Sequence, residues 1–112
     1  DVLVITGRLK DIIIRGGFNV SPMAVENVLL REHGVLEVAV VGLPHDFWGE
    51  IIVACLVAEA GANVETLQTG LRRRCAMELG EGARPDRYVW LDVLPRASTG
   101  KVRKHILEEQ LT

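Results

Sequence analysis

The chain of 112 residues has little of several features that mark specialised protein classes. It holds only two cysteines, Cys55 and Cys75, whose separation excludes a cysteine metal site and predicts buried thiols in a reducing compartment. Thirteen basic and fifteen acidic residues give a net charge of −2, without the basic surplus of a general nucleic-acid binder. No apolar run approaches the roughly 20 residues that span a bilayer. With no targeting segment recognisable either, we predict a cytoplasmic protein.

What is present is the composition of an ordinary globular domain. Hydrophobic residues make up 48% of the chain and charged residues 25%, which excludes disorder for most of it. The length predicts one domain. The chain starts at Asp1, without an initiator methionine and at the edge of a strand-like run over residues 2–6, so we expect a fragment of a longer protein.

Hydrophobic periodicity and turn signals predict a sheet with helices packed on it. Ser21-Pro22 and Asn63 are typical helix starts, and Gly16-Gly17 is typical of a tight turn. We therefore expect a small two-layer α+β domain, with a central, mostly antiparallel three-stranded sheet and an N-terminal β-hairpin. The predicted elements are a hairpin over 11–20, a helix over 21–34, strands over 35–43, 50–58 and 87–92, a helix after residue 63, and a terminal helix from about residue 101.

By itself the sequence contains no complete catalytic site. It lacks a nucleophile–base pair, a carboxylate dyad, a metal-ligand cluster and a phosphate-binding loop of known spacing. His33, His45 and His105 are scattered over three elements and are predicted to be surface residues. Lys10 and Lys101 lie on glycine-flanked loops. Spacing alone favours ordinary surface lysines, although each could reach an anion held by another domain.

Three motifs, in order along the whole chain, resemble those of the AMP-forming acyl-CoA synthetases. This superfamily also contains peptide-synthetase adenylation domains and firefly luciferases. Residues 7–26, GRLKDIIIRGGFNVSPMAVE, resemble the family's hinge motif, and residues 94–101, LPRASTGK, its C-terminal lysine motif. Residues 38–50, VAVVGLPHDFWGE, are similar to the sheet and loop between them. The resemblance implies that residues 1–112 form the small C-terminal lid domain, with its hinge near 7–11.

The resemblance implies a two-step ligase reaction. A carboxylic acid attacks the α-phosphate of ATP to give an acyl-adenylate and pyrophosphate, and the thiol of coenzyme A then displaces AMP. The small domain rotates between the steps and presents a different face in each. ATP, Mg²⁺ and the acid would be bound by a large N-terminal domain, so we expect the chain alone to be inactive. Fatty, aromatic and dicarboxylic acids all remain open as substrates, with fatty acid metabolism as one setting.

The same resemblance assigns roles to individual residues. Lys101 is the expected catalytic lysine of adenylation, Arg8 lies near the nucleotide ribose, and Lys10 is the expected hinge residue. The Gly16-Gly17 turn is expected to enter the active site for thioester formation, because glycine lets the backbone approach the narrow pantetheine arm.

Two further residues are expected on the coenzyme A side. Trp48 would stack on the adenine of coenzyme A, or be a partly buried loop residue, and Arg84 would contact the coenzyme A phosphates. The chain departs from the family pattern here, since Gly82-Ala83 replaces an aromatic–basic pair and Asp86 stands where a basic residue is common. Both departures weaken the expected phosphate contact.

Two alternative functions stay open. One is the C-terminal subdomain of an adenylation domain that charges a carrier protein, and the other is a non-catalytic binding or regulatory module of the same fold. The run TGKVRK at residues 99–104 and the isoleucines at 12–14 favour coenzyme A as the acceptor.

Overall fold

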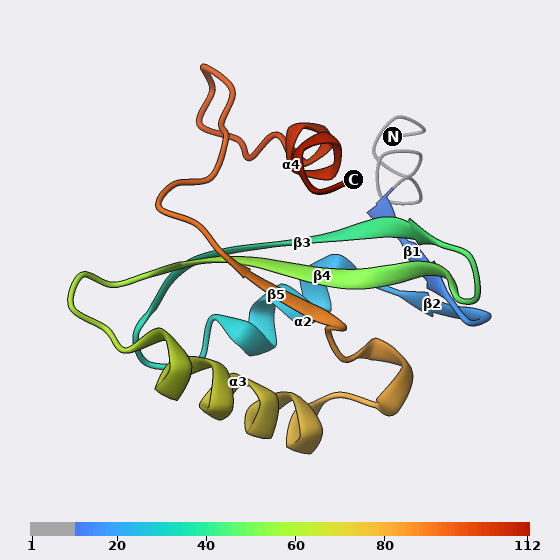
Figure 1. Cartoon of the computed structure of the whole chain (residues 1–112), viewed down its shortest axis with the longest axis horizontal. Coiled ribbons are helices and arrows are strands. Elements are labelled where there is room, and N and C mark those ends of the chain that lie inside the picture. The colour runs from blue at the N-terminus through green and yellow to red at the C-terminus, as the bar shows by residue number, and fades with distance from the viewer. Residues whose placement is uncertain (1–10) are drawn as a thin grey trace.

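The computed structural model describes residues 11–112. The predicted strand over 2–6, Arg8 and Lys10 lie outside the described residues. Within them, five strands form one sheet in the order β2-β1-β4-β3, and β5 pairs with β4 (Figure 1). The elements are β1 (Ile13–Arg15), β2 (Phe18–Val20), α2 (Pro22–Leu29), β3 (Val35–His45), β4 (Gly49–Ala58), α3 (Val64–Glu78), the 3₁₀ turn η1 (Glu81–Ala83), β5 (Arg87–Trp90) and α4 (Lys104–Leu111).

The sheet is mostly antiparallel, which confirms the predicted α+β class. β1 pairs antiparallel with both β2 and β4, and β3 pairs antiparallel with β4, whereas β5 runs parallel to β4. The predicted hairpin, β1–β2, is part of the central sheet because β1 pairs with β4, so the sheet has five strands and not the expected three. One edge of β4 is therefore shared by β1 and β5.

Helices cover both faces of this sheet, so the expected two layers become three (Figure 1). Ile52, Ala54 and Leu56 of β4 pack in one core cluster with residues of α2 and α3. The intervening Val53, Cys55 and Val57 belong to a second cluster that includes Leu107 of α4. Both faces are covered because β4 is a continuous apolar run. Successive side chains of a strand point to opposite faces, so a strand without polar alternation must be buried on both sides.

Local capping residues set the helix starts, as the sequence predicts. The Oγ of Ser21 accepts a hydrogen bond from the Ala24 N–H at the start of α2, and Asn63 Oδ1 accepts one from the Thr66 N–H at the start of α3. By contrast, α4 begins at Lys104, three residues later than expected. None of the helices described between residues 11 and 112 is long and apolar enough to cross a membrane.

The two turns at the end of the sheet are tight. Gly16 and Gly17 have φ angles of +59° and +88°, a conformation that confirms the predicted glycine turn. β3 and β4 extend further than predicted, so the expected six-residue loop shrinks to a short turn. The Nδ1 of His45 accepts hydrogen bonds from the N–H groups of Phe47 and Trp48, both at 3.1 Å, and fixes this turn.

Candidate functional site

The loop that bears Lys101 is held in a defined shape by backbone hydrogen bonds. The Ala97 N–H donates to the Lys101 carbonyl at 2.8 Å, and the Gly100 N–H donates to the Ala97 carbonyl at 2.9 Å. At the base of the loop, the Arg103 N–H donates to the Pro95 carbonyl at 2.8 Å. These contacts delay the start of α4 and leave Lys101 exposed near the tip of the loop.

An arginine ties this loop to the sheet. The Nη1 of Arg96 donates to the Gly100 carbonyl at 2.6 Å, and its Nη2 pairs with the carboxylate of Glu37 on β3. Among residues 11–112, no carboxylate lies within ion-pair distance of the Lys101 ammonium. The Lys101 side chain lines a groove of about 800 Å³, together with Thr99 and Lys104. The same groove is also lined by the acidic residues Glu26 and Glu108, so the ammonium of Lys101 is exposed in a groove that carries both signs of charge.

The glycine turn and Trp48 are in direct contact. The Gly16 N–H donates a 2.8 Å hydrogen bond to the Trp48 carbonyl. A Cβ placed on Gly16 would lie 2.8 Å from Cε3 of the indole, so only glycine fits there without moving the ring. Trp48 remains 37% exposed as a residue, and its side chain is therefore not fully covered by the domain.

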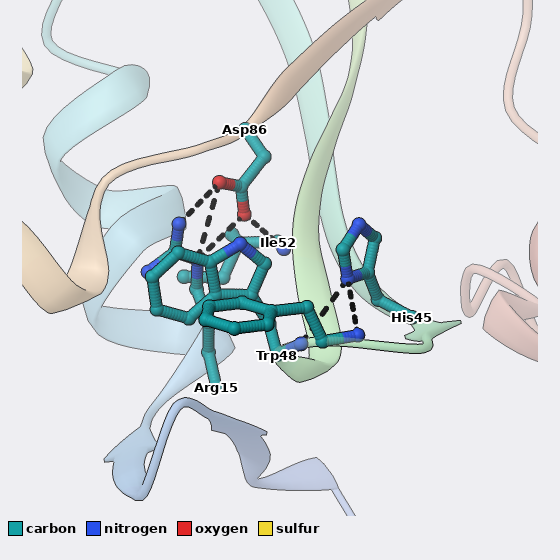
Figure 2. A network of polar contacts seen from close by, with 6 residues as sticks. Arg15, His45, Trp48, Ile52 and Asp86 are labelled. Atoms are coloured by element: carbon teal, nitrogen blue, oxygen red, sulfur yellow. Dashed lines mark hydrogen bonds and ion pairs between the residues drawn. The ribbon is translucent and has the colours of Figure 1, made fainter.

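Arg15 and Asp86 form an ion pair behind this tryptophan (Figure 2). The Nε of Arg15 donates to both carboxylate oxygens at 3.1 and 2.9 Å, and Nη2 donates to Oδ1 at 2.7 Å. The guanidinium carbon lies 4.1 Å from the centroid of the Trp48 ring, a cation–π arrangement. Asp86 Oδ2 also accepts the Ile52 N–H at 2.8 Å.

Sequence reasoning did not identify Arg15 and treated Asp86 only as a departure from the family pattern. A signal was available in the sequence, because Arg15 directly precedes the glycine turn and Asp86 brings an unexpected negative charge. The partnership itself could not be read from spacing, since the two residues are 71 positions apart.

Arg84 caps a helix in this structure. Its Nε donates to the Leu79 carbonyl and its Nη2 to the Ala76 carbonyl, both at 3.1 Å. These carbonyls lie at the C-terminal end of α3, where the helix has no donors of its own and a cation is favourable. Two donors of the guanidinium are therefore already engaged.

Within residues 11–112, the residues predicted for the site lie in three places, one of which is Arg84 at the end of α3. Gly16, Gly17 and Trp48 gather where the β1–β2 and β3–β4 turns meet. The loop of Lys101 lies on the α4 side of the sheet, away from those turns (Figure 1). Arg8 and Lys10 lie outside the described residues.

Histidine and carboxylate side chains do not form a metal site in the described part of the chain. His33, His45 and His105 are exposed, as predicted, and lie on different elements. Within residues 11–112, no three His, Cys, Asp or Glu side chains come together in a way that could hold an ion. The chemistry that these residues offer is therefore a positioned ammonium, a glycine turn and an aromatic surface.

Comparison with known proteins shows similarity over nearly the whole chain. The model of the AMP-binding enzyme C-terminal domain family matches residues 24–101. A long-chain-fatty-acid–CoA ligase of Mycobacterium tuberculosis is 41% identical over 108 residues, which cover 96% of this chain and 21% of that protein. A 4-chlorobenzoate–CoA ligase of a Pseudomonas species is 38% identical over 110 residues, which cover 98% of this chain and 21% of that protein.

The fold is similar to a solved structure as well. The structure of a Mycobacterium tuberculosis fatty acyl CoA synthetase matches with a TM-score of 0.84 at 41% identity, covering 92% of this chain and 20% of the other. The chain thus spans about a fifth of the length of the relatives that it matches.

Proposed function

Because the chain belongs to the AMP-binding enzyme C-terminal domain family, we propose that it is the small domain of a larger AMP-forming acid–CoA ligase. One observation carries the proposal. The chain presents two separate surfaces, an exposed lysine on a braced loop and a glycine turn beside an exposed indole. Each surface has the chemistry that one half-reaction needs.

The Lys101 surface suits adenylation. As an acid carboxylate attacks the α-phosphate of ATP and pyrophosphate leaves, negative charge builds on the phosphate oxygens. An ammonium about 4 Å away attracts such a charge by roughly 4 kcal/mol at an effective dielectric constant near 20. The loop hydrogen bonds fix the backbone of Lys101, which limits how much the loop must reorganise during the reaction. Magnesium enters with ATP and belongs to the large domain in this proposal.

The Gly16-Gly17 surface suits thioester formation. The thiol of coenzyme A attacks the adenylate carbonyl, the C–O bond to AMP breaks, and AMP leaves with the electron pair. A turn without side chains leaves room for the pantetheine arm, and the exposed part of the Trp48 indole is a surface for adenine stacking. Arg84 would act on the coenzyme A phosphates from the end of α3, through its charge and its remaining donors.

The two surfaces would serve one active site in turn. Rotation of the domain about the segment 7–11, with Lys10 as the hinge residue, would bring first Lys101 and then the glycine turn to the substrates. Arg8 would accompany the nucleotide ribose. The proposed setting is the cytoplasm, where ATP and coenzyme A are available.

The test is an assay of the full-length protein in two stages. Pyrophosphate release is measured with ATP and a panel of fatty, aromatic and dicarboxylic acids, and thioester formation is then measured with coenzyme A. We expect both with at least one acid, and neither with the 112-residue chain alone. Transfer to a carrier protein instead of coenzyme A would indicate a carrier-charging adenylation domain. An absence of pyrophosphate release with every acid would favour a non-catalytic module.

A further inference from the structure

We propose that Arg15 is a positioning residue for thioester formation: anchored on Asp86, it holds the Trp48 indole and the Gly16-Gly17 turn in the orientation that receives coenzyme A. The inference rests on the function proposed above and adds two residues, Arg15 and Asp86, to the site.

The Arg15–Asp86 pair lies where β1 and β5 meet β4. β1 has one ladder pair with β4, Arg15–Gly49, and β5 begins to pair with the same strand at Val53. Ile52 lies between these two pairings. Asp86 closes the gap, because its N–H donates to the Ile52 carbonyl at 2.7 Å while its carboxylate accepts the Ile52 N–H at 2.8 Å. The Asp86 carboxylate is thus fixed on β4 independently of Arg15.

This fixed carboxylate in turn orients the Arg15 guanidinium. Three N–H···O contacts join the two groups, and the side chains are only 16% and 23% exposed. A planar guanidinium bound through two nitrogens to an immobile carboxylate has one favoured plane. The guanidinium carbon lies over the Trp48 ring, 4.1 Å from its centroid, and Figure 2 shows the two side chains beside each other.

The indole and the turn are connected to Arg15 through direct contacts. Trp48 contacts the Gly16 backbone through both its carbonyl and its ring, and Arg15 is the residue that directly precedes Gly16. Because Arg15 covers part of the indole, adenine must use the part that stays exposed. An indole released from Arg15 would lose this orientation, and coenzyme A would then have to order it on binding.

The experiment compares variants of the full-length enzyme in both half-reactions. We expect Arg15→Gln and Asp86→Asn each to raise the KM for coenzyme A about tenfold, while adenylation stays within about twofold of wild type. Arg15→Lys should remain impaired, since lysine keeps the charge but lacks the planar two-nitrogen contact. Arg74→Gln is the matched control, because Arg74 forms a comparable ion pair with Glu32, away from the turn, and should leave this KM unchanged.

The sign of the Asp86 effect separates positioning from simple charge attraction. If Arg15 acted only by attracting the coenzyme A phosphates, removing the negative charge of Asp86 would lower the KM, and Arg15→Lys would restore it. Either result would overturn the proposal. A rise in KM for both Arg15→Gln and Asp86→Asn supports it.

A second measurement reports the contact without activity. In full-length enzyme labelled with 5-fluorotryptophan, the Trp48 resonance is assigned by its loss in Trp48→Phe. We expect this fluorine resonance to shift in Arg15→Gln and Asp86→Asn but not in Arg74→Gln. An unchanged resonance in both variants would overturn the proposal. If wild-type enzyme forms no thioester, the proposed function fails instead, and the fluorine spectra still report whether Arg15 holds the ring.

Discussion

Glu26 and Lys104 form an ion pair of 2.8 Å around the outer edge of β3, although their helices, α2 and α4, cover opposite faces of the sheet. The same Glu26 oxygen, Oε2, accepts the Val40 N–H at 2.9 Å. The Glu26 carboxylate thus accepts a backbone N–H of the edge strand β3. It also fixes the start of α4, three residues beyond Lys101. Glu26 therefore links the layer under the sheet to the loop that presents the proposed catalytic lysine.

Replacing Glu26 by glutamine should lower the free energy of unfolding of the 112-residue chain by about 1 kcal/mol. An amide oxygen can still accept the Val40 N–H, but Lys104 loses its charged partner while it stays partly buried. Urea unfolding measures the change. Glu109→Gln, on the exposed side of α4, is the control, and a loss as large as that of Glu26→Gln would contradict the linking role.

Replacing Lys101 by alanine in the full-length enzyme should slow adenylation by about 10²–10³-fold, the usual loss on removing one oriented electrostatic group. Thioester formation from preformed acyl-adenylate should stay near wild type, because it uses the surface at the glycine turn. Pyrophosphate exchange and adenylate-to-thioester conversion measure the two steps. Arg103→Ala removes a neighbouring exposed cation and should change either rate only a few-fold. An equal fall in both steps for Lys101→Ala would remove Lys101 from the proposed mechanism.

Two glycine variants separate backbone strain from contact with the indole. Gly17→Ala places a Cβ in open space at φ +88°, so the backbone strain alone should cost about 1–2 kcal/mol. Gly16→Ala carries similar strain at φ +59° and also pushes the Trp48 ring, at a further cost of about 1–3 kcal/mol. Urea unfolding of the two variants gives the comparison. Equal losses would show that the ring yields without cost.

Removing the Trp48 side chain should weaken coenzyme A binding and spare adenylation. Aromatic–base stacking contributes about 1–3 kcal/mol in nucleic-acid complexes, which corresponds to a KM raised roughly fivefold to 150-fold in Trp48→Ala. The half-reaction assays measure this split. Trp90→Phe is the matched control, because Trp90 bonds to Gln68 within the domain and faces no proposed ligand. An unchanged coenzyme A KM in Trp48→Ala would make Trp48 a purely structural residue.

Burial raises the pKa of the Cys55 thiol from its ordinary value of 9.0 to about 11, although Arg87 and Lys104 act in the opposite direction. Burial also raises the pKa of Tyr88 and of Cys75. Because these pKa values are higher in the folded state than in the unfolded state, the folded protein holds their protons more tightly. The resulting stabilisation of the folded state is complete below about pH 9 and, for Cys55, is lost as the pH rises through 11. Melting temperatures of the 112-residue chain should therefore fall between pH 9 and 11.

The contribution of Cys55 to this fall is testable by substitution. Cys55→Val keeps an apolar side chain on β4 and removes the thiol, so the loss of stability between pH 9 and 11 should become shallower by up to about 1.4 kcal/mol per pH unit. The slope of unfolding free energy against pH is the quantity to compare. Parallel slopes in wild type and variant would contradict the assignment to Cys55.

The sequence by itself was sufficient for features that neighbouring residues decide. Ser21-Pro22 and Asn63 predict the starts of α2 and α3, because a side-chain oxygen caps N–H groups only a few residues away. The Gly16-Gly17 turn follows from the freedom of glycine at positive φ. Family motifs assigned Lys101 and the glycine turn to the proposed site, and the structure adds how the two loops are built.

The tertiary structure alone decided which distant side chains meet. Arg15 finds Asp86 only because β1 and β5 share one edge of β4, and Glu26 reaches Lys104 only because α2 and α4 flank β3. Arg84 bonds to α3 because η1 turns the chain back onto the end of that helix. Periodicity and capping report on residues within a few positions, whereas an ion pair needs charges brought within about 4 Å by strand order and packing. The contacts behind Trp48 therefore could not be read from the sequence.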